Sequence, residues 1–321
     1  MHKELKGWVE WLGIEEPTLS IVNSNASTKQ YYRIENQTKK MLVLDASECK
    51  ELVPRMLGIG LRLKETKVLT PLARSFEQHK GFMLSDDIGS THLFDKCIDA
   101  GARTYYEKAI KTLVEMQKAP TINMKLYDMG FLIEEMNLML EWYLKKYLGH
   151  KIECVEAKMI LDSFMLIAKE VLAQPQETFV HSDYHSKNLM INENDEMVLI
   201  EFQDAREGAL TYDLVSLLYD AYVALDKRER KRFIKLFKNL KGIEVDDETF
   251  MRWVDFTAIQ RSLTQLGKFA RLSIRDGKTT QIEHVPLVLQ YILDLASNYP
   301  ELEQLVVILT PEETDSIGFT L

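Results

Sequence analysis

The fold is decided by His181-Ser182-Asp183-Tyr184-His185-Ser186-Lys187-Asn188, together with Val198-Leu199-Ile200-Glu201-Phe202-Gln203-Asp204. A short apolar segment at 177–180 precedes the first of these stretches, and another at 189–191 follows it. Residues 192–195 read Asn-Glu-Asn-Asp, a composition typical of a hairpin turn. The sequence therefore predicts a strand, a polar loop and then a β-hairpin whose second strand ends at an acidic residue.

Three side chains on this scaffold have the spacing of a phosphoryl-transfer site. Asn188 lies five residues after Asp183, and Glu201 ends the downstream apolar run. In kinase-like phosphotransferases the Asp accepts or orients the proton of the attacking hydroxyl, whereas the Asn and the acidic residue hold Mg²⁺ against the ATP phosphates. Magnesium prefers hard oxygen ligands of this kind. We therefore expect ATP-dependent phosphoryl transfer, with Asp183 as the catalytic residue and Asn188 and Glu201 as metal ligands.

Further polar residues surround these three. His181 is expected to buttress the loop by hydrogen bonding rather than to act as a base. His185 and Lys187 flank the acceptor site and either contact phosphate or substrate or have a plain loop role. Asp204 either binds metal or substrate or caps the next helix. Asp213 opens a predicted helix, where we expect it to be the N-cap and to brace the catalytic loop.

The composition indicates an ordinary globular protein and limits its partners. The chain has 321 residues, of which 46% are hydrophobic and 28% charged, and its formal net charge is -9. Nucleic acid is an unexpected partner because Lys and Arg form no large cluster, and the basic run 227–232 is expected to be the solvated face of a helix. No run approaches the ~20 apolar residues of a membrane span, and no signal-peptide core is present, so we expect a cytoplasmic enzyme. The three cysteines have neither disulfide-framework nor zinc-site spacing.

The periodicity predicts a small α+β lobe before a larger helical lobe. Strands are expected at 18–22, 30–34, 41–44, 68–72 and 81–84, with helices at 5–12 and 49–64. Later helices are expected at 102–118, 131–148, 155–173, 213–225, 230–240, 247–273 and 285–296. The polar stretch 85–90 is the expected boundary, which divides the chain into a nucleotide-binding lobe, 1–88, and a catalytic and substrate-binding lobe, 89–321. In such a two-lobed, protein-kinase-like fold, the backbone of Ser85 and Asp86 would hydrogen-bond adenine.

The expected phosphate-binding turn departs from the glycine-rich pattern. Asn25, Ala26 and Ser27 lie between two predicted strands, where small polar residues let backbone N–H groups approach phosphate. The third strand also lacks the lysine found in protein kinases. We expect Arg33 or Lys29, on the preceding strand, to supply that positive charge.

Assembled in order, these motifs resemble the aminoglycoside phosphotransferase superfamily. Within it, the chain looks like the bacterial anomeric kinases that phosphorylate N-acetylmuramate and N-acetylglucosamine at the 1-hydroxyl during cell-wall recycling. The catalytic loop is shared by the whole superfamily, whereas narrower markers point to the sugar-kinase branch. These are Phe202-Gln203-Asp204-Ala205, Thr211-Tyr212-Asp213-Leu214, and the helix from Gln260-Arg261 to Leu266-Gly267-Lys268-Phe269-Ala270-Arg271-Leu272.

The resemblance implies a protein-kinase-like fold, ATP, Mg²⁺ and a small-molecule sugar substrate in a pocket walled by large-lobe helices. Within that branch the missing third-strand lysine is usual. Gln260 and Arg261 are candidate substrate contacts, and Arg261 either faces sugar or phosphate or forms a surface ion pair. The family usually has Asp where this chain has Glu201, whose side chain is longer by one C–C bond, roughly 1.5 Å. The substitution can weaken or shift metal binding, or transfer part of it to Asp204.

Three functions are consistent with these residues. The first is a sugar 1-kinase in which Asp183 activates the anomeric hydroxyl. The second is a phosphotransferase for an aminoglycoside or another small molecule, which the negative net charge would suit if the substrate is cationic. The third is a catalytically impaired nucleotide-binding scaffold, which the substitution at Glu201 motivates. We favour the first.

Overall fold

The computed structural model describes residues 3–22, 29–35, 40–97 and 102–310. It consists of two compact units. Unit 1 comprises Met1–Pro120 and Lys187–Ala205, and unit 2 comprises Thr121–Ser186 and Arg206–Leu321. The chain therefore passes from unit 2 to unit 1 within the predicted catalytic loop, between Ser186 and Lys187. The lobe boundary expected at residue 88 stays a prediction.

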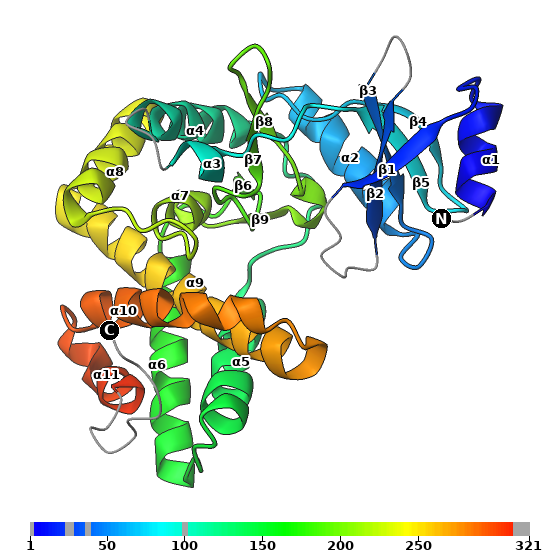
Figure 1. Cartoon of the computed structure of the whole chain (residues 1–321). Helices are drawn as coiled ribbons and strands as arrows, with labels where there is room; N and C mark the ends of the chain where they lie inside the picture. Colours follow the sequence, from blue (N-terminus) through cyan, green and yellow to red (C-terminus); the bar gives the residue numbers. More distant parts are fainter. Residues whose placement is uncertain (1–2, 23–28, 36–39, 98–101, 311–321) are drawn as a thin grey trace. The chain divides into compact units, whose positions relative to one another are not determined.

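Unit 1 contains a five-stranded antiparallel sheet in the order β1-β2-β3-β5-β4 (Figure 1). Its strands are β1 (Thr18–Val22), β2 (Gln30–Glu35), β3 (Lys40–Asp45), β4 (Ala73–Glu77) and β5 (Phe82–Asp86). The register pairs Tyr32 with Val43 and Val43 with Leu84, so these side chains share one face of the sheet. Helix α1 (Lys3–Trp11) packs Leu5 and Trp8 into the same apolar cluster.

The strand predicted at 68–72 is wrong, and β4 forms immediately after it. Leu69 makes only an isolated bridge to Val198, with the N–H of Leu199 donating to its carbonyl at 2.8 Å. Pro71 has no N–H to donate and therefore interrupts a ladder at this point. We expected a strand at 68–72 because that run is apolar. The strand that pairs at the edge of the sheet is instead β4, the more polar segment that follows.

The remaining parts of unit 1 include the predicted hairpin. Helices α2 (Leu52–Lys64), α3 (Leu93–Lys96) and α4 (Ala102–Met116) follow β3 and β5. Strands β7 (Leu189–Ile191) and β8 (Met197–Leu199) pair in antiparallel register, and the 3-10 turn η2 (Phe202–Asp204) follows. The hairpin predicted from the turn at 192–195 is confirmed.

Unit 2 is mainly helical. Its helices are α5 (Met129–Leu138), α6 (Cys154–Leu172), α7 (Tyr212–Leu218), α8 (Lys227–Lys241), α9 (Asp247–Asp276), α10 (Val285–Ala296) and α11 (Glu303–Leu309), with the π-helix η1 (Met139–Tyr147) and 3-10 turns η3 (Thr279–His284) and η4 (Pro300–Leu302). Two short strands, β6 (Thr178–Val180) and β9 (Arg206–Gly208), pair antiparallel. The expected α+β class is confirmed.

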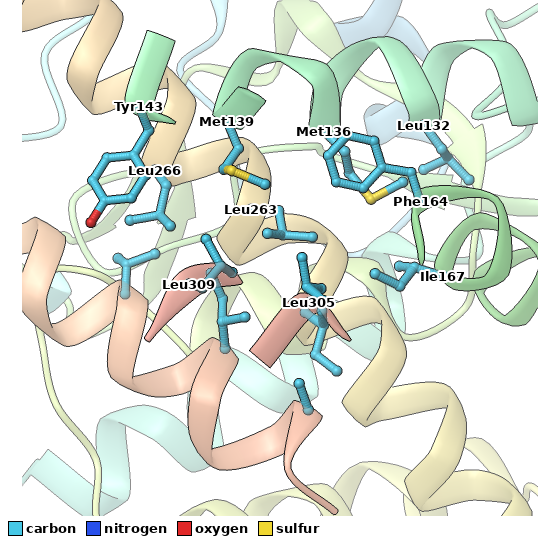
Figure 2. Packing of buried hydrophobic residues seen from close by; sticks show 14 of the residues in the cluster. Leu132, Met136, Met139, Tyr143, Phe164, Ile167, Leu263, Leu266, Leu305 and Leu309 are labelled. Atoms are coloured by element: carbon cyan, nitrogen blue, oxygen red, sulfur yellow. The ribbon is translucent and has the colours of Figure 1, made fainter. Parts of the chain in front are cut away.

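The core of unit 2 is built around α9. Figure 2 shows Leu263 and Leu266 of this helix among side chains of α5, η1, α6 and α11. Gly267 allows α9 to lie directly against the backbone at the end of α5. A Cβ at this position would lie 2.2 Å from the backbone carbonyl carbon of Leu138. No side chain fits there, so glycine is required by packing, although it lowers helix propensity.

Two helix predictions need correction. The segment predicted as one helix at 131–148 is α-helical to Leu138 and then π-helical. The helix predicted at 213–225 ends at Leu218. Beyond it, the carboxylate of Asp220 accepts a hydrogen bond from the N–H of Tyr222 at 2.8 Å. This local bond offers the backbone an alternative to the helical pattern.

Among residues 3–22, 29–35, 40–97 and 102–310, no helix has the length and apolar character needed to cross a membrane. Cys49, Cys97 and Cys154 form no disulfide among the residues that the structure describes. The same described ranges contain no group of three His, Cys, Asp or Glu side chains arranged to hold a metal.

Candidate active site

The loop that carries Asp183 is anchored to Asp213 in unit 2. The backbone N–H of His181 donates to one carboxylate oxygen of Asp213 at 2.7 Å, and that of Ser182 donates to the other at 3.1 Å. Ser182 has a φ of 79°, a conformation that is uncommon outside glycine and needs support from its surroundings. Asp213 therefore braces the loop, as predicted.

The expected N-cap role of Asp213 is wrong. Thr211 occupies the N-cap of α7, and Asp213 lies in the first turn with its carboxylate turned to the catalytic loop. Burial raises the pKa of Asp213 to about 7, while the two backbone donors act in the opposite direction. The carboxylate of Asp213 accepts hydrogen bonds from the distant catalytic loop and does not cap its own helix.

Asp183 is held by two cationic side chains. Arg261 donates from Nη2 to the carboxylate at 3.0 Å and from Nη1 to the carbonyl of Ser182 at 2.9 Å. His185 Nε2 lies 3.1 Å from the other carboxylate oxygen. The Asp183 side chain is 56% exposed, whereas that of Arg261 is 7% exposed. Within unit 2, the carboxylate of Asp183 is thus exposed, whereas the arginine that holds it is buried.

This arrangement keeps Asp183 ionised. Desolvation by the surrounding protein would raise its pKa, but His185 and Arg261 together hold that pKa well below its usual range. Burial acts to lower the pKa of His185, yet its contact with Asp183 leaves that pKa raised. An ionised carboxylate can accept the hydrogen bond of an incoming hydroxyl and orient it.

His181 has the buttressing position that was predicted. It is fully buried, and its Nδ1 accepts a hydrogen bond from the N–H of Asp183 at 3.2 Å. A second brace, which the sequence did not indicate, is Asp220: its carboxylate accepts from the N–H of Ser186 at 2.9 Å. The two ends of the loop segment in unit 2 are therefore fixed by two buried aspartates, Asp213 and Asp220.

Aromatic rings line the same part of unit 2. Tyr222 lies edge-on to His185, with ring centroids 5.2 Å apart, and edge-on to His284 at 4.9 Å. Phe269 lies 6.0 Å from His284. The sequence analysis did not identify Tyr222 or His284, because they approach His185 only through the packing of the segment after α7 against η3. Tyr222, His284 and Phe269 thus form a wall of packed rings that begins at His185, the neighbour of Asp183.

In unit 1, Asn188 and Glu201 lie at the same end of the β7–β8 hairpin. The N–H of Ile200 donates to the carbonyl of Asn188 at 3.2 Å, which continues the pairing of Leu189 with Leu199. Glu201 follows directly, with a φ of 60°. The two oxygen-bearing side chains thus come from neighbouring backbone positions, and their donor chemistry fits Mg²⁺.

Glu201 already has two partners within unit 1. The ammonium of Lys29 forms an ion pair with its Oε2, and Gln203 Nε2 donates to the same oxygen at 3.1 Å. Lys29 was one of the two candidates for the positive charge missing from the third strand, and it directly precedes β2. A metal at Glu201 would compete with this ion pair.

The other candidate, Arg33, is directed elsewhere in unit 1. Its guanidinium binds Asp87 through two hydrogen bonds of 2.5 and 3.1 Å and also donates to the carbonyl of Gly89 at 3.2 Å. Asp204, a proposed metal or substrate ligand, forms an ion pair with Arg55 of α2. Arg55 was not identified from the sequence.

The expected adenine-binding residues belong to β5. Ser85 is buried and pairs with Leu42 of β3, and Asp86 binds Arg74 through hydrogen bonds of 2.7 and 2.9 Å. Their contact with adenine stays a prediction. Asn25, Ala26 and Ser27 lie outside the described residues.

Two predicted substrate contacts have other surroundings. Lys187 lies in unit 1, with its ammonium 5.2 Å from the centre of the Phe94 ring. Gln260 is fully buried within α9, where its Nε2 donates to Thr264 at 3.2 Å. Their roles toward substrate stay predictions. The expected contact of Arg261 with sugar or phosphate also stays a prediction, because the structure shows this side chain buried and bonded to Asp183.

Comparison with known proteins decides the family. The profile of the phosphotransferase enzyme family matches residues 18–253. This chain belongs to that family. It is 31% identical over 309 residues to an N-acetylmuramate/N-acetylglucosamine kinase of Pseudomonas aeruginosa, a match that spans 94% of this chain and 89% of the relative. A protein of the same name from Neisseria meningitidis is 28% identical over 99% of this chain and 98% of its own length.

Solved structures support the fold. A choline kinase of Streptococcus pneumoniae matches with a TM-score of 0.65 at 13% identity, covering 91% of this chain and 98% of the other. An ADP-bound aminoglycoside phosphotransferase matches with a TM-score of 0.64, at 13% identity and with the same coverage. The expected protein-kinase-like fold is confirmed, and the protein is a phosphotransferase with a hydroxyl group as acceptor.

Proposed function

We propose that this protein is an ATP-dependent sugar kinase that phosphorylates the anomeric 1-hydroxyl of N-acetylmuramate or N-acetylglucosamine. The relatives that carry this substrate in their names align with almost the entire chain. The observation that carries the reaction is the accessible, ionised carboxylate of Asp183 between Arg261 and His185. A carboxylate in this state can receive and align a sugar hydroxyl.

In the proposed reaction, the sugar hydroxyl donates a hydrogen bond to Asp183. Its oxygen attacks the γ-phosphorus of ATP, a new O–P bond forms, and the bond to the β-phosphate oxygen breaks to release ADP. The hydroxyl proton passes to the carboxylate of Asp183 and then to solvent. Arg261 fixes the direction of the carboxylate, and Asp213 fixes the backbone that carries it.

Asn188 and Glu201 are the residues that would hold Mg²⁺. When bound, the ion neutralises charge on the ATP phosphates and so favours attack at phosphorus. The neighbouring positions of both residues at the end of the β7–β8 hairpin support this role. Lys29 pairs with Glu201 and so places its ammonium beside one of these two residues, where it would also face a phosphate group bound through the ion.

An assay of the purified protein with Mg²⁺ and ATP across a panel of hexosamines tests the proposal. We expect ADP release that depends on N-acetylmuramate or N-acetylglucosamine, with sugar 1-phosphate as the product. The position of the phosphate is read by ³¹P–¹H coupling to the anomeric proton. A phosphate found on another hydroxyl would be consistent with kinase activity but would contradict the assignment to the anomeric 1-hydroxyl.

A second candidate is phosphorylation of an aminoglycoside. The supporting observation is the fold shared with the ADP-bound aminoglycoside phosphotransferase, together with the net charge of -9. Aminoglycoside turnover without reaction on the two cell-wall sugars would favour it. A scaffold without catalysis is the third candidate, and nucleotide binding with no turnover on either substrate panel would favour that.

A further inference from the structure

A pocket in unit 2 lies among α7, α8, α9 and α10. Its volume is about 600 Å³. It is lined by one face of α8, the first turns of α9 and the C-terminal half of α10, with Tyr219 from the end of α7. The pocket includes none of the residues that contact Asp183. The pocket is thus separate from the immediate surroundings of Asp183, although the hydroxyl of Tyr291 donates to the carbonyl of Asp220, a residue that also holds Ser186 of the catalytic loop.

The rim of the pocket is basic. Lys227, Lys231, Lys235 and Lys238 recur at helical spacing along the lining face of α8. Two are neutralised locally: Lys227 lies 3.0 Å from Asp294, and Lys238 forms an ion pair with Asp247. Lys231 and Lys235 are exposed and form no ion pair or hydrogen bond within the described part of the chain, although Lys231 interacts electrostatically with Asp255 and Lys235 with Asp247. These two ammonium groups can receive an anion.

The floor of the pocket is aromatic. Arg230 is buried, donates to the carbonyl of Leu225 at 2.7 Å, and lies 5.0 Å from the ring centre of Tyr219 and 5.2 Å from that of Tyr291. The rings of Tyr219 and Tyr291 meet edge to face. Phe250 also lines the pocket. Such a surface can pack against the apolar face of a sugar or another ring.

One buried acceptor in the wall lacks a partner. Asp255 is 9% exposed, and its Oδ2 accepts a hydrogen bond from the hydroxyl of Tyr299 at 2.8 Å. Its Oδ1 is buried and has no hydrogen-bond partner among the residues that the structure describes. A buried acceptor left unpaired lowers the stability of the folded protein. A ligand hydroxyl or amide N–H that entered the pocket would supply the missing donor.

We propose that this pocket is a binding site for a small phosphorylated sugar. The phosphate would contact Lys231 and Lys235, a hydroxyl or amide group would donate to Asp255, and the ring would pack on Tyr291 and Phe250. The three requirements are met by different walls, so a simple anion or a neutral sugar satisfies only part of them. Binding here does not require that the protein phosphorylate a sugar.

The test uses N-acetylglucosamine 6-phosphate, inorganic phosphate and N-acetylglucosamine as three separate probes of the full chain. Calorimetry measures affinity, and amide hydrogen exchange over residues 227–241 and 285–298 locates the bound probe. We expect the sugar phosphate to protect both segments and to bind at least about tenfold more tightly than inorganic phosphate, with no protection there by the neutral sugar.

A matched pair of variants assigns the effect to the rim. Lys231→Ala/Lys235→Ala should lower the affinity for the sugar phosphate by about tenfold or more, because both charge-assisted contacts are lost. Arg228→Ala/Lys241→Ala removes the same charge from α8 outside the pocket lining and should leave affinity within about twofold. Equal losses in the two variants, protection only outside these segments, or equal binding of inorganic phosphate would overturn the proposal. Kinase activity on the sugar panel is assayed separately, so either proposal can fail alone.

Discussion

Arg261 Nη2 donates to the Asp183 carboxylate at 3.0 Å, while Nη1 of the same guanidinium donates to the carbonyl of Ser182. One side chain thus fixes both the catalytic carboxylate and the backbone that precedes it. A lysine carries the charge but lacks the planar fork that makes two such bonds at once.

Arg261→Lys should therefore lower kcat by about tenfold or more, equivalent to roughly 1.4 kcal/mol, because the carboxylate loses its fixed direction. The KM for ATP should change little. Lys268→Arg is the control, because Lys268 lies on the same helix but pairs with Glu135. Steady-state kinetics with circular dichroism separate the effects, and an unaltered kcat in a folded Arg261→Lys protein would contradict the positioning role.

His185 should make the stability of the protein depend on pH. Burial acts to lower its pKa, but Asp183 raises it above the ordinary value of 6.5. A raised folded-state pKa means that the folded protein binds the proton more tightly than the unfolded chain. The stabilisation is fully present below pH 6.5 and is lost as the pH rises through the folded-state pKa.

Thermal unfolding of the wild type and His185→Gln between pH 5.5 and 8.5 measures this effect. The difference in free energy of unfolding should be larger at the acidic end. A difference that stays constant, or grows with pH, would show that His185 is not held protonated by Asp183.

Asp255 should lower the stability of the folded protein at neutral pH and, as with His185, its contribution should become less favourable as the pH rises. Desolvation raises its pKa from 3.8 to about 6, although the hydroxyl of Tyr299 acts to lower it. The folded protein holds this proton more tightly than the unfolded chain, so stability falls as the pH rises from about 4 to 6. Asp255→Asn removes that loss and should gain about 1–3 kcal/mol relative to wild type above pH 6. Urea unfolding at pH 4 and pH 7.5 checks it; the gain should vanish at pH 4.

Glu201 should set the magnesium requirement. Glu201→Gln removes the charge that would hold the ion and should raise the Mg²⁺ concentration for half-maximal activity by about tenfold or more. Gln203→Ala is the control, since Gln203 contacts Glu201 at 3.1 Å without adding charge. Binding of ADP with and without Mg²⁺, measured by calorimetry, gives a readout apart from turnover. If Glu201→Gln leaves both Mg²⁺ dependences intact, Glu201 is not a ligand.

Gly267→Ala should destabilise unit 2 by about 1–3 kcal/mol, because the new Cβ would meet the backbone at Leu138. Gly58→Ala in α2 is the matched control, since a Cβ there meets nothing within 4 Å. Removal of that helical glycine should stabilise by about 0.5–1 kcal/mol. Chemical unfolding compares the two, and similar effects would contradict the close helix crossing.

Local patterns predicted much of this fold and part of its site. The spacing of Asp183 and Asn188 and the turn at 192–195 gave the loop and hairpin, because both are encoded within about twenty residues. The predicted strand at 68–72 failed since apolar content was weighed above the missing N–H of Pro71. Local sequence alone could identify Asp213 as a brace only because it lies in the first turn of a recognisable helix.

Contacts between distant segments could not be predicted in this way. Lys29 and Glu201 are 172 residues apart, and their ion pair depends on how the sheet and the hairpin of unit 1 pack. Tyr222 and His284 form their ring contact through the packing of two turns in unit 2. Asp220 lay inside a predicted helix, where nothing marked its carboxylate as a partner of Ser186.

The central claim is that the ionised carboxylate of Asp183 orients the sugar hydroxyl. Its most direct test is the kcat for sugar 1-phosphate formation by Asp183→Asn, beside calorimetric binding of ADP and the unfolding temperature of the same variant. We expect kcat to fall by about 10²–10⁴-fold while ADP binding and folding persist. A folded, ADP-binding Asp183→Asn protein with wild-type kcat would contradict the account.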